Sequence, residues 1–152
     1  MKRLTDDLHG RAPARIMRAG VATNDVLIRE IVRAAGEAVP LVRWPRGLDR
    51  SRARELVHAY LSDHSTYDEE GELQIIRLPR ALVLQGVHDC KSSAVFAYAM
   101  LRAAGYRCAL RFIKQPARGW WSHVYVMAEG VAVDPLLPLG HEATATAVLD
   151  YI

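Results

Sequence analysis

Two segments in the N-terminal half of the chain carry apolar residues at the spacing of a helix. The first begins near Thr23 or Asn24, either of which suits an N-cap, and the second begins after Asp49. The apolar stripes consist of Leu27, Ile28, Ile31, Val32 and Ala35, and of Ala53, Leu56, Val57, Tyr60 and Leu61. We predict two amphipathic helices, each of which buries one face.

The segment that follows Asp89 is apolar nearly all round from Ser93 to Leu101. Asp89 suits its N-cap, and Gly105 suits its C-terminal end because glycine readily adopts the left-handed backbone that closes many helices. A helix that is apolar on every side is buried on every side. We therefore predict a central helix at this position.

Residues typical of strands lie on both sides of this helix. Before it, we predict a short strand at 73–78 that Pro79 ends, and a loop with room for one helical turn at 80–87. After it, we predict strands at 106–113, 121–127 and 131–134, with Glu129-Gly130 in the turn between the last two. Helices followed by antiparallel strands indicate an α+β fold.

Composition is that of an ordinary globular protein. The chain has 152 residues, of which 51% are hydrophobic and 24% are charged. No apolar run approaches the ~20 residues that a membrane-spanning helix needs. The first 20 residues have no apolar stretch of the kind that secretory signals carry. We therefore expect a cytoplasmic protein without a membrane partner.

The net charge of +3 is unevenly distributed along the chain. Residues 1–54 hold twelve Lys and Arg against six Asp and Glu, whereas residues 55–89 hold two against seven. We predict a flexible basic arm over residues 1–20 and a single domain over residues 21–152. Because no aromatic interleaving or nucleic-acid motif accompanies the basic residues, we do not expect nucleic acid as a partner.

The chain contains two cysteines, Cys90 and Cys108, so it is not a disulfide scaffold. Cys90 opens the predicted central helix, where unpaired N–H groups and the helix dipole favour a thiolate. Cys108 lies within a predicted strand and is interpreted as a small buried side chain. A zinc site built from these cysteines with His88 and His123 matches no standard spacing, so we expect no metal and no cofactor.

A nucleophilic thiol needs a base, and the base needs a group that orients it. If Glu129-Gly130 forms a two-residue hairpin turn, Asp134 lies opposite Tyr125 and is a diagonal neighbour of His123 on the same face. A carboxylate there fixes the imidazole tautomer and stabilises its charged form. If the central helix packs on this face, Cys90 at its start can meet His123, but periodicity alone leaves that packing open.

At these residues the sequence resembles the transglutaminase-like branch of the papain-like cysteine enzymes. That family combines a Gly-Asp-Cys box that opens a helix, a His-Val strand and an Asp-Pro strand end. The resemblance covers roughly residues 50–140, and the run from Tyr67 to Arg80 is also similar to small members encoded in phage and prophage. The matching segments are Gly86-Val87-His88-Asp89-Cys90-Lys91-Ser92, Leu101-Arg102-Ala103-Ala104-Gly105-Tyr106, Ser122-His123-Val124-Tyr125-Val126 and Val133-Asp134-Pro135.

The resemblance implies a papain-like core in which the helix that carries the cysteine packs on a sheet that carries the histidine and the aspartate. It implies Cys90 as nucleophile, His123 as base and Asp134 as orienting carboxylate. Gln85 resembles the side-chain oxyanion donor of papain-like enzymes, and either Trp121 walls a substrate groove or it packs at the edge of the sheet. His88 replaces the glycine of the box, where it either adds an ionisable group to the cleft or is an ordinary loop residue.

The resulting hypothesis is a cysteine-dependent acyl-transfer enzyme that hydrolyses a protein, peptide or other amide through a thioester. An alternative is an inactive module that binds phage structural proteins, in the cytoplasm or on a virion. A third interpretation is a peptidoglycan peptidase of another cysteine family, but no glycine follows Ser92-Ser93 as that family's motif requires. The sequence leaves the substrate and the oligomeric state open.

Overall fold

The computed structural model describes residues 3–18, 24–68 and 73–152. Within these ranges the fold is mixed α+β, as the sequence predicts. The helices are α1 (Asn24–Ala38), α2 (Ala53–Asp63), α3 (Pro79–Gln85) and α4 (Cys90–Ala103), with 3₁₀ turns at Val39–Leu41 and Arg50–Arg52. The strands are β1 (Ala14–Arg18), β2 (Thr66–Tyr67), β3 (Leu73–Arg77), β4 (Val87–His88), β5 (Cys108–Lys114), β6 (His123–Ala128), β7 (Val131–Val133) and β8 (Ala147–Tyr151).

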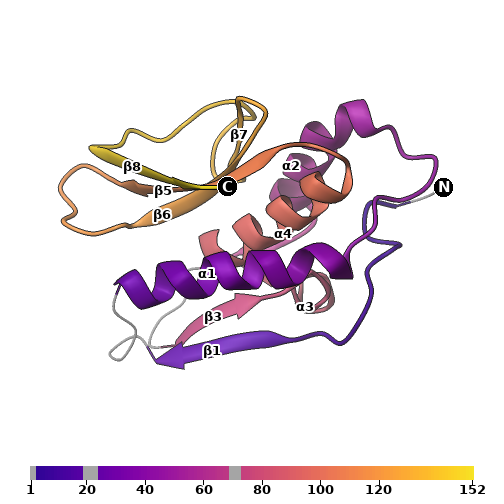
Figure 1. The fold of residues 1–152 in the computed structure, drawn as a ribbon, viewed down its shortest axis with the longest axis horizontal. Helices are drawn as coiled ribbons and strands as arrows, with labels where there is room; N and C mark the ends of the chain where they lie inside the picture. Colours follow the sequence, from indigo (N-terminus) through magenta and orange to yellow (C-terminus); the bar gives the residue numbers. More distant parts are fainter. Residues whose placement is uncertain (1–2, 19–23, 69–72) are drawn as a thin grey trace.

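The strands form small sheets around the helices. Strands β7, β6, β5 and β8 form an antiparallel sheet in that order, β1 pairs antiparallel with β3, and β2 pairs parallel with β4. The four-stranded sheet lies on one side of α1 and α4, and the β1–β3 pair lies on the other side (Figure 1). Helices therefore separate the two antiparallel sheets.

Helix α4 is the centre of the core, as its apolar sequence predicts. Every residue from Lys91 to Leu101 is buried, and the helix contacts α1, α2, α3, β3, β5 and β6. Asp89 is the N-cap, since its side chain accepts a hydrogen bond of 3.0 Å from the Ser92 N–H. Gly105 has a φ of +97° just beyond the C-terminus. The predicted helix and both of its ends are confirmed.

Both predicted amphipathic helices are present. Helix α1 begins at Asn24, while the alternative cap Thr23 lies outside the described residues. Before α2, the Asp49 carboxylate accepts hydrogen bonds from the N–H and the hydroxyl of Ser51. That cap starts the 3₁₀ turn that leads into α2, so the predicted start after Asp49 is confirmed.

Several short elements differ from the sequence-based expectation. Within residues 80–87, predicted to be a loop with room for one helical turn, the structure has helix α3, which starts at Pro79 because proline suits the first turn and ends where Gly86 has a φ of +66°. Residues 14–18 of the expected flexible arm form β1 along β3. Strand β8 and the β2–β4 pair were not predicted, because each is defined by a partner distant in sequence. The division of the chain into an arm and a domain stays a prediction.

Candidate active site

Cys90 is the first residue of α4, and the start of that helix is anchored to β3. The Ser92 hydroxyl accepts a hydrogen bond of 2.9 Å from the Arg77 N–H and donates one of 3.3 Å to the Ile75 carbonyl. Ser92 is fully buried. This side chain therefore satisfies backbone groups on β3 and holds the Cys90 turn in place.

The turn between β6 and β7 has the predicted length and register. Glu129 and Gly130 both have positive φ, at 48° and 82°, which is the pattern of a type I′ turn. Val126 pairs with Val133, and Ala128 pairs with Val131. The predicted register is confirmed, and Asp134 follows β7 directly at the position that faces Tyr125.

His123 and Asp134 form a buried pair. His123 Nε2 lies 2.7 Å from Asp134 Oδ2, and Asp134 Oδ1 accepts a hydrogen bond of 3.1 Å from the Leu136 N–H. Burial lowers the pKa of His123, but its hydrogen bond to Asp134 and the influence of Cys90 outweigh that effect and raise this pKa to about 10. The imidazole is therefore held in its charged form at neutral pH.

Cys90 meets His123 at the end of the sheet. Strand alternation places His123 on the face of Tyr125, whereas α4 packs on the opposite face through Val124 and Val126. Because His123 is the first residue of β6, its ring still reaches Cys90, whose hydrogen bond contributes to the raised pKa of the histidine. With Nε2 on Asp134, Nδ1 is the ring nitrogen that faces the thiol.

A cleft of about 430 Å³ opens over these residues. Cys90 is partly exposed and lines it together with His123. Leu27, Ile28 and Ile31 of α1 form an apolar wall. The loop between β5 and β6 forms another wall through Gln115, Arg118, Trp120, Trp121 and Ser122. Trp121 thus lies in the cleft wall, which was one of the two positions that the sequence left open for it.

Asn24 fixes the backbone of this loop, a role that the sequence did not reveal. Its Oδ1 accepts a hydrogen bond of 2.7 Å from the Trp121 N–H, and its Nδ2 donates one of 3.2 Å to the Trp121 carbonyl. The two residues are 97 positions apart. From the sequence alone, Asn24 is interpreted only as a candidate N-cap of α1.

His58 of α2 holds the segment that carries Asp134, and it too was missed. Its Nε2 lies 3.1 Å from the Asp134 carbonyl oxygen and 2.7 Å from that of Leu137. Ser62, one turn further along α2, donates a hydrogen bond of 3.4 Å to the Pro135 carbonyl. The only sequence signal was a histidine beside the apolar stripe of a helix.

Two predicted site residues lie outside the cleft lining. Gln85 is exposed at the end of α3, where its Oε1 accepts a hydrogen bond of 2.5 Å from Arg77 Nε. His88 is 1% exposed, and its Nε2 lies 3.0 Å from the Leu61 carbonyl oxygen. Burial lowers the pKa of His88 and so favours the neutral ring. The side-chain amides that do line the cleft belong to Asn24, Gln74 and Gln115.

The two charged residues next to Cys90 along the chain form an ion pair with each other. Lys91 and Asp89 are both buried, line the cleft and form an ion pair through Nζ and Oδ2.

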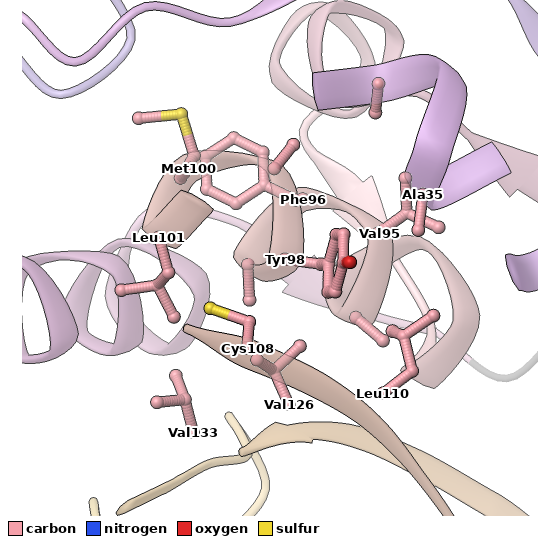
Figure 2. Close-up of a cluster of buried hydrophobic side chains, with 14 of the residues drawn as sticks. Ala35, Val95, Phe96, Tyr98, Met100, Leu101, Cys108, Leu110, Val126 and Val133 are labelled. Carbon is pink, nitrogen blue, oxygen red and sulfur yellow. The ribbon is translucent and has the colours of Figure 1, made fainter. Parts of the chain in front are cut away.

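Cys108 is 3% exposed among the core side chains of β5 and α4 (Figure 2). Burial raises the pKa of the Cys108 thiol to about 12, so that thiol stays protonated.

Comparison with known protein families, with curated proteins and with solved structures finds no match to this chain. In the described ranges no three His, Cys, Asp or Glu side chains gather so as to hold a metal ion. None of the described helices has both the length and the apolar character that a membrane span requires.

Proposed function

We propose that this chain is a cysteine-dependent amide hydrolase of transglutaminase-like type, with a papain-like core. The observation that supports this proposal most directly is that Cys90 and His123 meet at one cleft while the buried Asp134 is hydrogen-bonded to the histidine. Two of these side chains are buried and hydrogen-bonded to each other, while the thiol is the partly exposed one. A nucleophile beside an oriented base is the arrangement that acyl transfer needs.

The first half of the reaction forms a thioester. The Cys90 sulfur attacks the carbonyl carbon of a substrate amide, and the carbonyl oxygen takes up the negative charge. The backbone N–H of Cys90 is the expected donor to that oxygen. When the tetrahedral intermediate collapses, the C–N bond breaks and the His123 Nδ1 proton passes to the departing amine nitrogen.

The second half restores the enzyme. A water molecule gives a proton to His123 and attacks the thioester carbonyl. The C–S bond then breaks, which releases the carboxylic acid and the Cys90 thiolate. Asp134 keeps Nε2 of the ring protonated throughout, so that Nδ1 is the nitrogen that exchanges protons.

Alkylation of the two cysteines tests this proposal directly. The protein is treated with iodoacetamide at neutral pH, and modification of each cysteine is followed by mass spectrometry. We expect Cys90 to react about tenfold or more faster than a free thiol such as glutathione, because an adjacent base activates a nucleophile. Cys108 serves as the internal control, since its thiol is buried and stays protonated.

Two variants complete the test. His123→Ala is expected to bring the alkylation rate of Cys90 down to that of the free thiol, and Cys90→Ser is expected to abolish hydrolysis of peptide amides. If Cys90 in the unmodified protein reacts no faster than glutathione, the proposal is wrong. That outcome would favour the alternative of an inactive assembly module.

A further inference from the structure

Two cations lie on the two tryptophans of the β5–β6 loop. Arg118 Cζ lies 5.8 Å from the centre of the Trp120 ring, and Lys114 Nζ lies 5.0 Å from the centre of the Trp121 ring. Contacts of this kind hold a cation over an aromatic face without neutralising it. The loop leads directly into His123, and Arg118 lines the same cleft as Cys90 and His123.

The environment of these cations differs from that of their neighbour Arg111. Arg111, on the same strand as Lys114, donates hydrogen bonds of 2.8 Å to Glu142 and Asp150. Among the described residues no carboxylate forms an ion pair with Arg118 or Lys114. Among the described residues, Arg111 is thus neutralised by two carboxylates, whereas Arg118 in the cleft lining and Lys114 beside Trp121 have no acidic partner.

The other charged groups of the cleft are compensated by partners of their own. Asp89 is the acidic residue in the described lining, and it already forms an ion pair with Lys91. The raised pKa of His123 keeps that ring positive, with Asp134 and Cys90 as the groups that compensate its charge. Among the described lining residues, Arg118 is then the charge without an acidic partner. A concave surface with uncompensated positive charge concentrates anionic ligands.

The apolar part of the cleft lining indicates what kind of ligand carries the negative charge. Leu27, Ile28 and Ile31 of α1 line the cleft with apolar side chains. A small inorganic anion gains nothing from such a wall, whereas a peptide can place an apolar side chain against it and an acidic side chain beside Arg118. The exposed Trp120 ring adds a flat surface for the peptide to pack on.

We propose that the substrate is a peptide segment with an Asp or Glu side chain close to the scissile amide, bound by Arg118 of the β5–β6 loop that carries the two tryptophans. This proposal rests on the hydrolase function proposed above. It goes beyond that function because it assigns a substrate class, and because it makes Arg118 a determinant of specificity with no role in bond breaking.

The full chain is incubated with a peptide library of random sequence, and products of hydrolysis or deamidation are identified by mass spectrometry. We expect Asp and Glu to be enriched near the reacting amide. A synthetic peptide is then made that carries an intact cleavage sequence from the library, with an acidic residue near the reacting amide. Arg118→Glu is expected to lower kcat/KM for this peptide by about tenfold, mostly through KM, because a charge at the rim acts on binding. Raising the salt concentration is expected to weaken the wild-type preference.

Arg107→Glu is the matched control. Arg107 is exposed near the other end of β5, outside the cleft lining, and its replacement changes the net charge by the same amount. Equal losses in the two variants would overturn the proposal, since the effect would then follow total charge. A library that yields no acidic preference would also overturn it, as would a library without products when Cys90 alkylates rapidly. Unreactive Cys90 would instead overturn the proposed hydrolase function, and the substrate class with it.

Discussion

Replacing Asp134 by asparagine tests the electrostatics of the site. Asparagine preserves the shape of the side chain and an acceptor for the Leu136 N–H, but it removes the negative charge that lies 2.7 Å from His123 Nε2. In the unmodified protein that charge, together with Cys90, raises the pKa of His123 from 6.5 to about 10 against the opposing effect of burial. We therefore expect Asp134→Asn to lower the pKa of His123.

The size of the effect follows from the charge that is lost. An opposite charge at this distance shifts a pKa by about 1–3 units, and each unit corresponds to ~1.4 kcal/mol. The variant is thus expected to weaken the charged form of His123 by ~1.4–4 kcal/mol. Titration of the histidine ring signals by NMR between neutral and alkaline pH measures this shift directly.

A variant elsewhere on the sheet provides the control. Asp150→Asn removes a carboxylate that binds Arg111, so it is expected to leave the His123 titration unchanged. If His123 in the unmodified protein titrates at or below its ordinary pKa, the assigned electrostatics are wrong. The same conclusion follows if Asp134→Asn and Asp150→Asn shift it equally.

The raised pKa also gives stability a pH dependence of known sign. Folding stabilises the protonated form of His123, so this contribution is fully present below a pH of about 6.5. It is lost as the pH rises toward about 10, where the folded protein releases the proton. The unfolding free energy measured in urea should therefore fall over this range, and it should fall less for Asp134→Asn.

Two further substitutions test the supports of the site. Lys91→Met leaves the buried Asp89 carboxylate without its cation and is expected to destabilise the fold by ~3–5 kcal/mol in urea unfolding; a loss below ~1 kcal/mol would show that the pair is dispensable. His58→Ala removes the donor that faces the carbonyl oxygens of Asp134 and Leu137 and is expected to cost ~1–3 kcal/mol. It should also lower kcat with little change in KM, and an unchanged kcat would contradict a positioning role.

The features that the sequence predicted well are those that local rules determine. The caps of α4 depend on Asp89 and Gly105, which act on backbone groups a few residues away. The pairing of β6 with β7 depends on a two-residue turn, which leaves only one register that fits the alternation of side chains. Contact between His123 and Asp134 follows from that register, so sequence reasoning reached it.

The features that the sequence did not predict depend on contacts between distant segments. Asn24 binds Trp121 across 97 positions, and His58 reaches the Asp134 segment from a separate helix. Strand β8 exists because β5 offers it an edge, which no local pattern in the C-terminal residues indicates. Gln85 was expected, from the resemblance, to be an oxyanion donor, whereas in the structure it lies at the end of α3 and its Oε1 accepts a hydrogen bond from Arg77.

The meeting of Cys90 and His123 lies between these cases. The sequence left this contact dependent on how α4 packs, and α4 packs on the face of the sheet opposite to the one that carries His123. The contact forms because each residue begins its element, so that both lie where the helix and the sheet end together. Side chains alternate between the two faces of a sheet within a strand, but a side chain at the end of a strand can reach past the edge of the sheet.

The β6–β7 turn and the β5–β6 loop differ in how freely their lengths can vary among related chains. The Glu129-Gly130 turn sets the phase of Asp134 against His123, so adding one residue there would separate the pair. The β5–β6 loop is closed at its base by the hydrogen bond from the Ser122 N–H to the Ile113 carbonyl, so insertions beyond that bond leave the strand register intact. Relatives are therefore expected to keep the turn at two residues while the tryptophan-bearing loop changes in length and sequence, which would let substrate preference diverge around unchanged chemistry.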